Sequence, residues 1–301
     1  MERSLIPFLV ADRPISLSII KGITLPPNVR IGIMGQATTT RLFQEKFRGY
    51  PRKVDEIHLN GRPQDKNLKR QTVKMVDSGI FAKNGCTMTY DTLFNTYEWM
   101  RAEYGVMIDV FKDCEATIRS AKDAMNTYGQ RAWSFQLVGV VQGEQLDDYL
   151  HCYEQLLGFG FTRIAIGGLL KRRENTVRYV NVRDERLLEE ALSSIRKQFD
   201  PKWLFVLGAF HPKPIRLFQE YGVWGSDYKG WIFNYAKKDV VIDLIRSKKL
   251  QKAYRVARKD LRIRDVRKMT EQELRFSLTR HFVEVYVIKA IYSNGSAAVD
   301  A

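Results

Sequence analysis

Eight short apolar runs, most of them followed by a stretch with helical spacing, constrain the fold of this chain more than any other feature. Each run has the length and the aliphatic and aromatic content of a β-strand. The runs are residues 4–10, 30–34, 73–76, 106–110, 135–141, 163–166, 203–207 and 222–225. Helical patterns follow at 39–47, 91–104, 115–128, 146–157, 184–199 and 215–221. This alternation predicts a parallel sheet covered by helices.

Closing that sheet on itself gives a (β/α)8 TIM barrel with a C-terminal helical extension, which is the fold we predict. An open doubly wound sheet is the alternative, but no Gly-x-Gly-x-x-Gly fingerprint or phosphate loop follows any of the runs. We expect residues 1–237 to form the barrel, and residues 238–301 to add basic helices packed on it within the same domain. Ile15 to Ile20 could form a small hairpin strand, closed by Gly22.

The composition is strongly basic, with 49 Lys and Arg against 34 Asp and Glu and a formal net charge of +15. Such an excess favours an acidic partner, of which nucleic acid is the commonest. A membrane surface is the rival, but no apolar run is long enough to cross a bilayer. The three cysteines, Cys86, Cys114 and Cys152, have no paired spacing. We therefore expect the protein to be located in the reducing cytoplasm and to bind no metal.

Two stretches hold much of the positive charge, residues 48–70 and 246–268. The first is either a solvated surface loop or a nucleic-acid contact. The second has helical spacing in its earlier part. If nucleic acid is the partner, these stretches would follow its phosphates. The residues that we expect to contact phosphates are Arg52, Lys53, Lys248, Lys249 and Lys252.

Three aspartates occur where strands are expected to end or lie. Asp77 directly follows the run 73–76, and Asp227 closely follows the run 222–225. The carboxyl ends of barrel strands carry the chemistry of this fold, although an aspartate after a strand often only caps a turn. Asp109 lies inside the apolar run 106–110, where a buried charge needs a partner or a ligand. Two carboxylates in unequal surroundings could divide nucleophilic and acid/base work.

Polar and glycine residues follow two further strands, as Gln142-Gly143 and Gly167-Gly168. A glutamine side chain offers a donor and an acceptor together, as recognition of a base edge requires. Adjacent glycines let backbone N–H groups approach a planar ligand. Ordinary turn chemistry is the competing explanation for both pairs.

The order of these motifs along one barrel resembles the tRNA-guanine transglycosylase family, the base-exchange enzymes of queuosine and archaeosine synthesis. The resemblance covers roughly residues 4–233. The family patterns Asp-Ser-Gly-Gly-aromatic, Val-Gln-Gly-Gly, Gly-Gly-Leu and Leu-Met-Gly are matched, with substitutions, by Asp77-Ser78-Gly79-Ile80-Phe81, Val141-Gln142-Gly143-Glu144, Gly167-Gly168-Leu169 and Val206-Leu207-Gly208. The segment that holds the family's nucleophile is Gly225-Ser226-Asp227 here.

This resemblance implies a role for each matched residue. Asp227 would attack C1′ of a target guanosine and displace guanine, and Asp77 would be the general acid/base. The other matched residues would hold the base, through hydrogen bonds from Asp109, Gln142 and the Gly167-Gly168 backbone and through stacking between Phe81 and Leu207. The incoming base would be a 7-deazaguanine such as preQ0 or preQ1, and no cofactor is expected.

Departures from the tRNA enzymes point towards DNA. The family's C-terminal Cys-x-Cys-x-x-Cys…His zinc site, which supports tRNA binding and dimerisation, is missing because no cysteine follows Cys152. After Gly-Gly-Leu the chain continues with Lys171 and Arg172, which we expect to contact nucleic acid. A compact, basic, zinc-free chain is similar to the phage-type DpdA branch, the DNA-guanine transglycosylases. A viral member would act in the host cytoplasm.

Two other functions remain open at this point. One is a tRNA-guanine transglycosylase with a degenerate C-terminus. The other is a non-catalytic barrel that only binds nucleic acid or a catalytic partner. The presence of both Asp77 and Asp227 argues against the second, since a binding subunit has no need for two carboxylates at one barrel mouth.

Overall fold

A computed structural model describes residues 5–21, 23, 30–50, 72–80, 86–172, 179–183, 185–210, 214–229, 231, 270, 273 and 280, with the backbone alone for 170–172, 179–183 and 185. The chain divides into two compact units. The first comprises Met1–Pro14 and Pro27–Tyr228, and the second comprises Ile15–Pro26 and Lys229–Ala301. No helix in the described ranges is long and apolar enough to cross a membrane.

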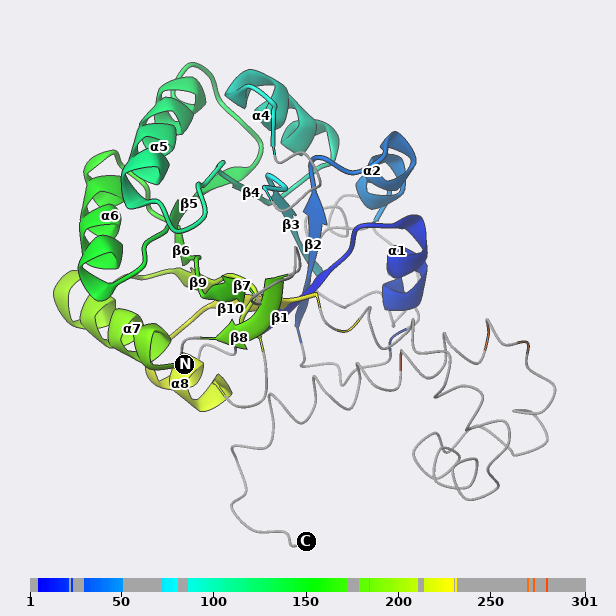
Figure 1. Cartoon of the computed structure of the whole chain (residues 1–301). Coiled ribbons are helices and arrows are strands. Elements are labelled where there is room, and N and C mark those ends of the chain that lie inside the picture. The colour runs from blue at the N-terminus through cyan, green and yellow to red at the C-terminus, as the bar shows by residue number, and fades with distance from the viewer. Residues whose placement is uncertain are drawn as a thin grey trace, which may run out of the picture. The chain divides into compact units, whose positions relative to one another are not determined.

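The first unit is a closed barrel of eight parallel strands, seen end-on in Figure 1. The strands are β1 (Ile6–Val10), β2 (Ile31–Gln36), β3 (Thr72–Asp77), β4 (Tyr104–Val106), β5 (Gln136–Val141), β6 (Ile164–Ile166), β9 (Leu204–Val206) and β10 (Gly225–Tyr228). Their order around the ring is β1-β10-β9-β6-β5-β4-β3-β2, and β1 closes it by pairing with both β10 and β2. The predicted (β/α)8 TIM barrel is confirmed.

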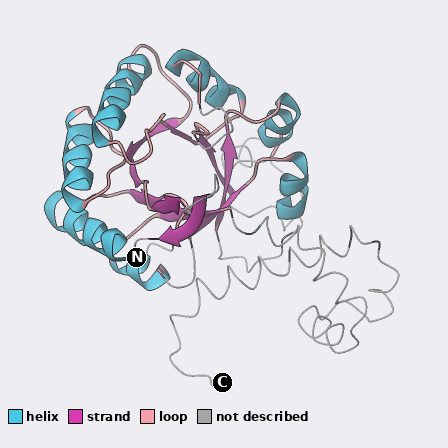
Figure 2. Cartoon of the chain, viewed as in Figure 1, coloured by secondary structure: helices cyan, strands magenta, loops and turns pink. Residues whose placement is uncertain are grey.

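Helices surround the strands on the outside of this unit (Figure 2). They are α2 (Arg41–Arg48), α4 (Tyr90–Trp99), α5 (Cys114–Tyr128), α6 (Leu146–Gly158), α7 (Glu185–Phe199) and α8 (Ile215–Glu220). Each follows a strand, as the sequence pattern predicted. Phe43 and Phe47, four residues apart on α2, are both fully buried, which confirms that this spacing marks the inner face of the helix.

Large side chains fill the barrel because the facing strands leave room for them. Phe8 of β1 is fully buried and meets Phe205 edge-on, with ring centroids 5.2 Å apart. On the neighbouring strand, a Cβ at Gly32 would lie 2.2 Å from the Phe8 ring. Only glycine fits there, so Gly32 and Phe8 form a matched pair within the barrel core.

Two local predictions from the sequence are wrong. Ile15 to Ile20 form α1 (Pro14–Lys21), not a hairpin strand. Proline at the first helical position favours a helix start, and the helix buries Ser16, Ile19 and Ile20 at helical spacing. The helix expected at 91–104 ends at Trp99, before Arg101, whose φ of 55° is left-handed. That early turn frees Tyr104–Val106 to become β4.

Among the described residues, a second sheet of two strands was not predicted from the sequence pattern. β7 (Leu170–Arg172) and β8 (Tyr179–Arg183) form a separate two-stranded antiparallel sheet between β6 and α7 in the chain.

Within the extension expected at 238–301, the structure describes only Thr270, Glu273 and Arg280. The backbone N–H of Thr270 donates to the Glu273 carboxylate at 2.8 Å, and the backbone N–H of Glu273 donates to the Thr270 hydroxyl at 3.3 Å, which is the expected capping box. How this extension is arranged stays a prediction.

A buried lysine joins β3 to the end of α2. Lys74 is 0% exposed. Its ammonium donates to the carbonyls of Phe47 at 2.8 Å, Tyr50 at 3.1 Å and Arg48 at 3.4 Å. A cation at the carboxyl end of a helix satisfies carbonyls that have no partner inside the helix.

We expect Lys74→Met to lower the free energy of unfolding by roughly 2–4 kcal/mol, since the variant keeps the volume but removes the charged donor that three carbonyls at the end of α2 share. Denaturant unfolding measures this change. Lys46→Met, at an exposed position on α2, is the matched control and should change stability by less than about 0.5 kcal/mol. Equal stabilities of the two variants would contradict the capping role.

Candidate active site

The predicted site residues lie at or beyond the carboxyl ends of the strands. Asp77 is the last residue of β3, Gln142 follows β5, Gly167 and Gly168 follow β6, and Leu207 follows β9. Parallel strands in a closed barrel end at one rim, so these residues share the mouth at which enzymes of this fold keep their chemistry. Asp227, on β10, is separated from β3 around the ring by β1 and β2.

Asp109 does not lie inside a strand as predicted. β4 ends at Val106, and the apolar residues that follow form a loop held by side chains from helices. The N–H of Ile108 donates to the Tyr90 hydroxyl at 3.1 Å, and the N–H of Val110 donates to the Thr117 hydroxyl at 3.0 Å. Because these side chains replace a neighbouring strand as partners, the apolar pattern continues past the strand's end. Asp109 is nevertheless 5% exposed.

Asp227 also differs from the prediction, because it lies within β10 and not after a strand. The run at 222–225 precedes most of β10, and only Gly225 belongs to both. The backbone N–H of Gly208 donates to Oδ1 of Asp227 at 2.6 Å. Next to it, the Ser226 hydroxyl donates to the carbonyl of Val206 at 2.7 Å. Asp227, 6% exposed, is thus a strand-anchored carboxylate whose rotation is fixed by the loop after β9.

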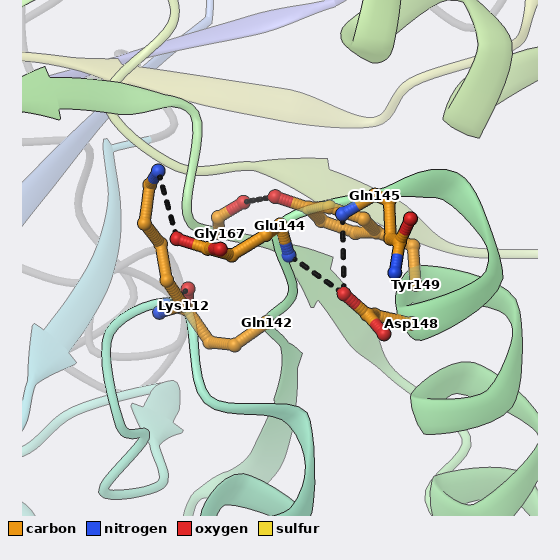
Figure 3. Close-up of polar contacts among 7 residues, drawn as sticks. All are labelled: Lys112, Gln142, Glu144, Gln145, Asp148, Tyr149 and Gly167. Carbon is orange, nitrogen blue, oxygen red and sulfur yellow. Dashed lines mark hydrogen bonds and ion pairs between the residues drawn. The ribbon is translucent and has the colours of Figure 1, made fainter.

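Gln142 is the centre of a hydrogen-bonded cluster that joins two loops of the rim. Its side-chain Nε2 donates to Oδ2 of Asp109, and its Oε1 accepts the backbone N–H of Lys112 at 3.1 Å. Lys112 has a φ of 62°, a left-handed conformation that is uncommon for a residue with a side chain. Its ammonium pairs with Glu144 at 3.4 Å (Figure 3). Both ends of the Gln142 amide are therefore fixed, and the amide cannot flip without losing a bond.

The turn that carries Gly167 and Gly168 is held by the helix after β5. The hydroxyl of Tyr149 on α6 donates to the carbonyl of Gly167 at 2.8 Å (Figure 3). Asp148, one residue earlier, accepts the N–H groups of Glu144 and Gln145 at 2.9 and 3.1 Å. One helix N-terminus thereby positions both the glutamine loop and the glycine turn.

The charge state of Asp109 is set by burial and by its neighbour. The pKa of Asp109 is raised from 3.8 to about 7, first by burial and then by the negative charge of Asp77, while the Gln142 hydrogen bond opposes the shift. Asp77 also contributes to raising the pKa of the Cys86 thiol, for which burial is the main cause. The two aspartates therefore interact electrostatically, and Asp109 can gain or lose a proton near neutral pH.

Several residues at this rim escaped the sequence reasoning. Lys112, Glu144 and Tyr149 position the predicted residues, and only the fold brings them together. Ser78, beside Asp77, is 0% exposed, and its hydroxyl has no hydrogen-bond partner among the described residues. It had been recognised only as part of the Asp-Ser-Gly motif. A buried hydroxyl without a partner next to a candidate catalytic carboxylate is a position where a ligand could supply the missing bond.

The structure tests the cysteines only in part. Cys114 and Cys152, on neighbouring helices, are in hydrogen-bond contact, although their spacing suggested no pairing. Burial raises the pKa of Cys152 to about 12, so this thiol stays protonated. No group of three or more His, Cys, Asp or Glu that could hold a metal occurs in the part of the chain that the structure describes. The expectation of no bound metal stays a prediction.

Other predicted contacts lie outside the described residues. These are Phe81, proposed to stack on the base, and the phosphate contacts Arg52, Lys53, Lys248, Lys249 and Lys252. For Lys171 and Arg172 the structure describes the backbone, which forms β7. Leu207, the other residue expected to stack on the base, is half-buried, and its N–H donates to the carbonyl of Ile166 at 2.8 Å.

We expect Gly168→Ala to disrupt the site. Gly168 has a φ of 73°, and an added Cβ would lie 2.6 Å from the Tyr149 hydroxyl and 2.7 Å from Oε1 of Gln142. Left-handed strain of about 1–3 kcal/mol, together with displacement of Gln142, should weaken guanine binding by at least about tenfold. Calorimetric titration with guanine measures this change. Gly158→Ala, where an added Cβ meets nothing within 4 Å, is the control and should bind like the parent protein.

Comparisons with known proteins show the fold and nothing finer. No protein-family model matches the sequence, and no curated protein matches it. A fructose-bisphosphate aldolase from Campylobacter jejuni is similar in structure, with a TM-score of 0.58 at 10% identity over 96% of this chain and 90% of that one. A proposed fructose-1,6-biphosphate aldolase from Coccidioides immitis has a TM-score of 0.53 at 10% identity over 97% and 93%. At such identity the likeness is one of barrel architecture, an architecture that enzymes use.

Proposed function

We propose that this protein is a DNA-guanine transglycosylase, which exchanges guanine in DNA for a 7-deazaguanine base such as preQ0. The observation that carries the proposal is the hydrogen-bonded pair of Asp109 and Gln142 beside Asp77, at the barrel mouth that Asp227 shares. This is a donor–acceptor array that interacts electrostatically with Asp77, at a rim to which β10 also brings Asp227. Guanine, which presents two donors beside one acceptor on its pairing edge, is complementary to it.

The base would be held by the residues that the rim already fixes. Ionised Asp109 would accept hydrogen bonds from N1–H and the amino group of guanine. The amide of Gln142 and the backbone N–H of Gly168 would donate to O6. Because the Gln142 amide is clamped by Asp109 and Lys112, little side-chain freedom is lost on binding. Phe81 and Leu207 would stack on the two faces of the ring.

The exchange would proceed in two balanced displacements. An oxygen of Asp227 attacks C1′, the bond between C1′ and N9 breaks, and the electron pair leaves with guanine, which is neutralised by a proton from Asp77 in its protonated form. The incoming deazaguanine then gives its N9 proton to Asp77, its N9 attacks C1′, and the ester to Asp227 breaks. The N–H of Gly208 holds Asp227 in one orientation throughout, which favours attack along a fixed direction.

The choice of DNA rests on the net charge of +15 and on the lack of the family's zinc-ligand cysteines in residues 153–301. The target nucleotide would have to leave the stack, because a carboxylate on the barrel rim cannot reach C1′ within a closed duplex. Unstacking costs a few kcal/mol, which phosphate contacts and the Phe81–Leu207 sandwich would offset. A tRNA substrate is the alternative that the assay below separates.

The test offers radiolabelled guanine or preQ0 to the protein together with duplex DNA, single-stranded DNA or tRNA transcripts. The proposal predicts label in DNA and not in tRNA. Label in tRNA alone would overturn the choice of polymer while leaving the base-exchange chemistry in place. No label in any polymer, from protein that binds both guanine and DNA, would refute the exchange reaction.

A further inference from the structure

The β7–β8 ribbon lies beside the proposed base-binding turn but takes no part in the barrel. β7 begins two residues after Gly168, and α7 begins two residues after β8 ends. Among the described residues, the two strands pair only with each other, through Lys171 with Val180 and Arg172 with Tyr179. A strand-to-helix connection in an α/β barrel needs about 2–6 residues, so this excursion is not required to close the fold.

An isolated two-stranded ribbon is marginally stable on its own, which makes a purely structural role a poor explanation. The composition of the ribbon indicates a binding role. β7 and β8 contain three basic residues, Lys171, Arg172 and Arg183, and no acidic residue. The resulting net charge of +3 in two short strands suits a polyanion.

The position and shape of the ribbon indicate which kind of nucleic acid it would bind. The major groove of B-form DNA is wide enough for a two-stranded β-ribbon, whereas the major groove of an A-form RNA helix is deep and too narrow to be read. Register places Arg172 and Tyr179 on one face of the ribbon, and Lys171 and Val180 on the other. A ribbon of this kind at the barrel mouth would meet the nucleotides next to the one being exchanged.

We propose that the β7–β8 ribbon enters the major groove of duplex DNA beside the target guanine, and that it selects B-form DNA over RNA. This inference rests on the proposed base exchange for its location but concerns binding, which is measured separately. Phosphate contacts by the ribbon position the duplex, and contacts with base edges set the preference for flanking sequence.

The test measures binding of the full chain to a DNA duplex, an RNA duplex of the same sequence and single-stranded DNA, by fluorescence anisotropy over a range of salt. The parent protein should bind the DNA duplex most tightly. Lys171→Ala/Arg172→Ala should weaken binding to the DNA duplex by about tenfold or more and flatten its salt slope by up to about two units. Binding to the RNA duplex should stay within about twofold, so the preference for DNA is lost.

The matched control removes two exposed basic residues from α5, as Arg119→Ala/Lys122→Ala. It should affect the three nucleic acids about equally. A bulky substituent at C5 of the flanking pyrimidines, which blocks the major groove alone, should weaken binding of the parent protein and leave the Lys171/Arg172 variant unchanged.

Failure of the ribbon proposal and failure of the proposed base exchange would give different experimental results. If the Lys171/Arg172 variant keeps the DNA preference, or loses affinity equally for DNA and RNA, the ribbon proposal is wrong even when base exchange is observed. If no exchange is found in any polymer while the variant loses selectivity for duplex DNA, the ribbon proposal stands and the proposed reaction fails.

Discussion

Replacing Asp227 with asparagine should lower the rate of guanine exchange by at least about 10³-fold, because a neutral amide cannot attack C1′. The amide oxygen can still accept the N–H of Gly208, which donates to the carboxylate at 2.6 Å in the parent protein. The barrel should therefore stay folded, and Tm should change by no more than a few degrees. The measurement is the initial rate of labelled guanine incorporation, with Tm as the check on folding.

Asp147→Asn provides the matched control, since it removes an exposed carboxylate from the first turn of α6. It should exchange guanine at a rate close to that of the parent protein. An Asp227→Asn rate within tenfold of the parent value would show that another group is the nucleophile.

Replacing Asp109 with asparagine or alanine should harm base binding more than folding. In the proposed complex the ionised carboxylate would accept two donors of guanine, and hydrogen bonds to a charged group contribute about 1.5–3 kcal/mol each. Affinity for guanine should therefore fall by at least about tenfold, as measured by calorimetric titration. A variant that unfolds, and that binds guanine normally once refolded, would show that Asp109 is structural.

The pH dependence of guanine binding has a definite sign. The pKa of Asp109 is about 7, and the proposed complex uses the ionised form. Guanine affinity should rise by up to about tenfold per pH unit below pH 7 and level off above it. The asparagine variant should lack this slope. An affinity that falls as pH rises through 7 would mean that the protonated acid binds the base.

Stability should show the opposite trend. The folded pKa of Asp109 lies above its ordinary value of 3.8, so the folded state holds the proton more tightly than the unfolded chain. The stability gained from the protonated carboxyl is fully present below about pH 4 and is lost as pH rises through about 7. At about 1.4 kcal/mol per unit the loss has an upper bound of about 4 kcal/mol. Denaturant unfolding at pH 5 and pH 8 should therefore favour Asp109→Asn over the parent protein at the higher pH.

The architecture could be predicted because barrel strands are short, apolar and separated by helices of ordinary length. The ends of the strands could be predicted less well from the sequence. The apolar run 106–110 extended past β4 because Tyr90 and Thr117 supply hydrogen bonds that a neighbouring strand would otherwise supply. Tertiary partners of this kind leave no mark on the local pattern, and α1 was missed because its β-branched residues also suit a strand.

The candidate site was likewise predictable only in part. Asp77, Gln142 and the Gly167-Gly168 pair could be found from their places after apolar runs, since chain order alone brings strand ends to one rim. Their supports could not be found. Lys112 reaches Gln142 from thirty residues away in the chain, and Tyr149 reaches Gly167 from eighteen. The ribbon was missed because its strands pair only with each other and carry charges where a barrel strand has apolar residues.

The covalent intermediate is the most direct test of the proposed reaction. Protein incubated with duplex DNA and no incoming base, then denatured and digested with protease and nuclease, should yield a peptide that carries a deoxyribose ester. Mass spectrometry should place that ester on Asp227, and the Asp227→Asn variant should yield none. Base exchange without any such adduct, or an adduct on another residue of the rim, would contradict the assignment of Asp227 as the nucleophile.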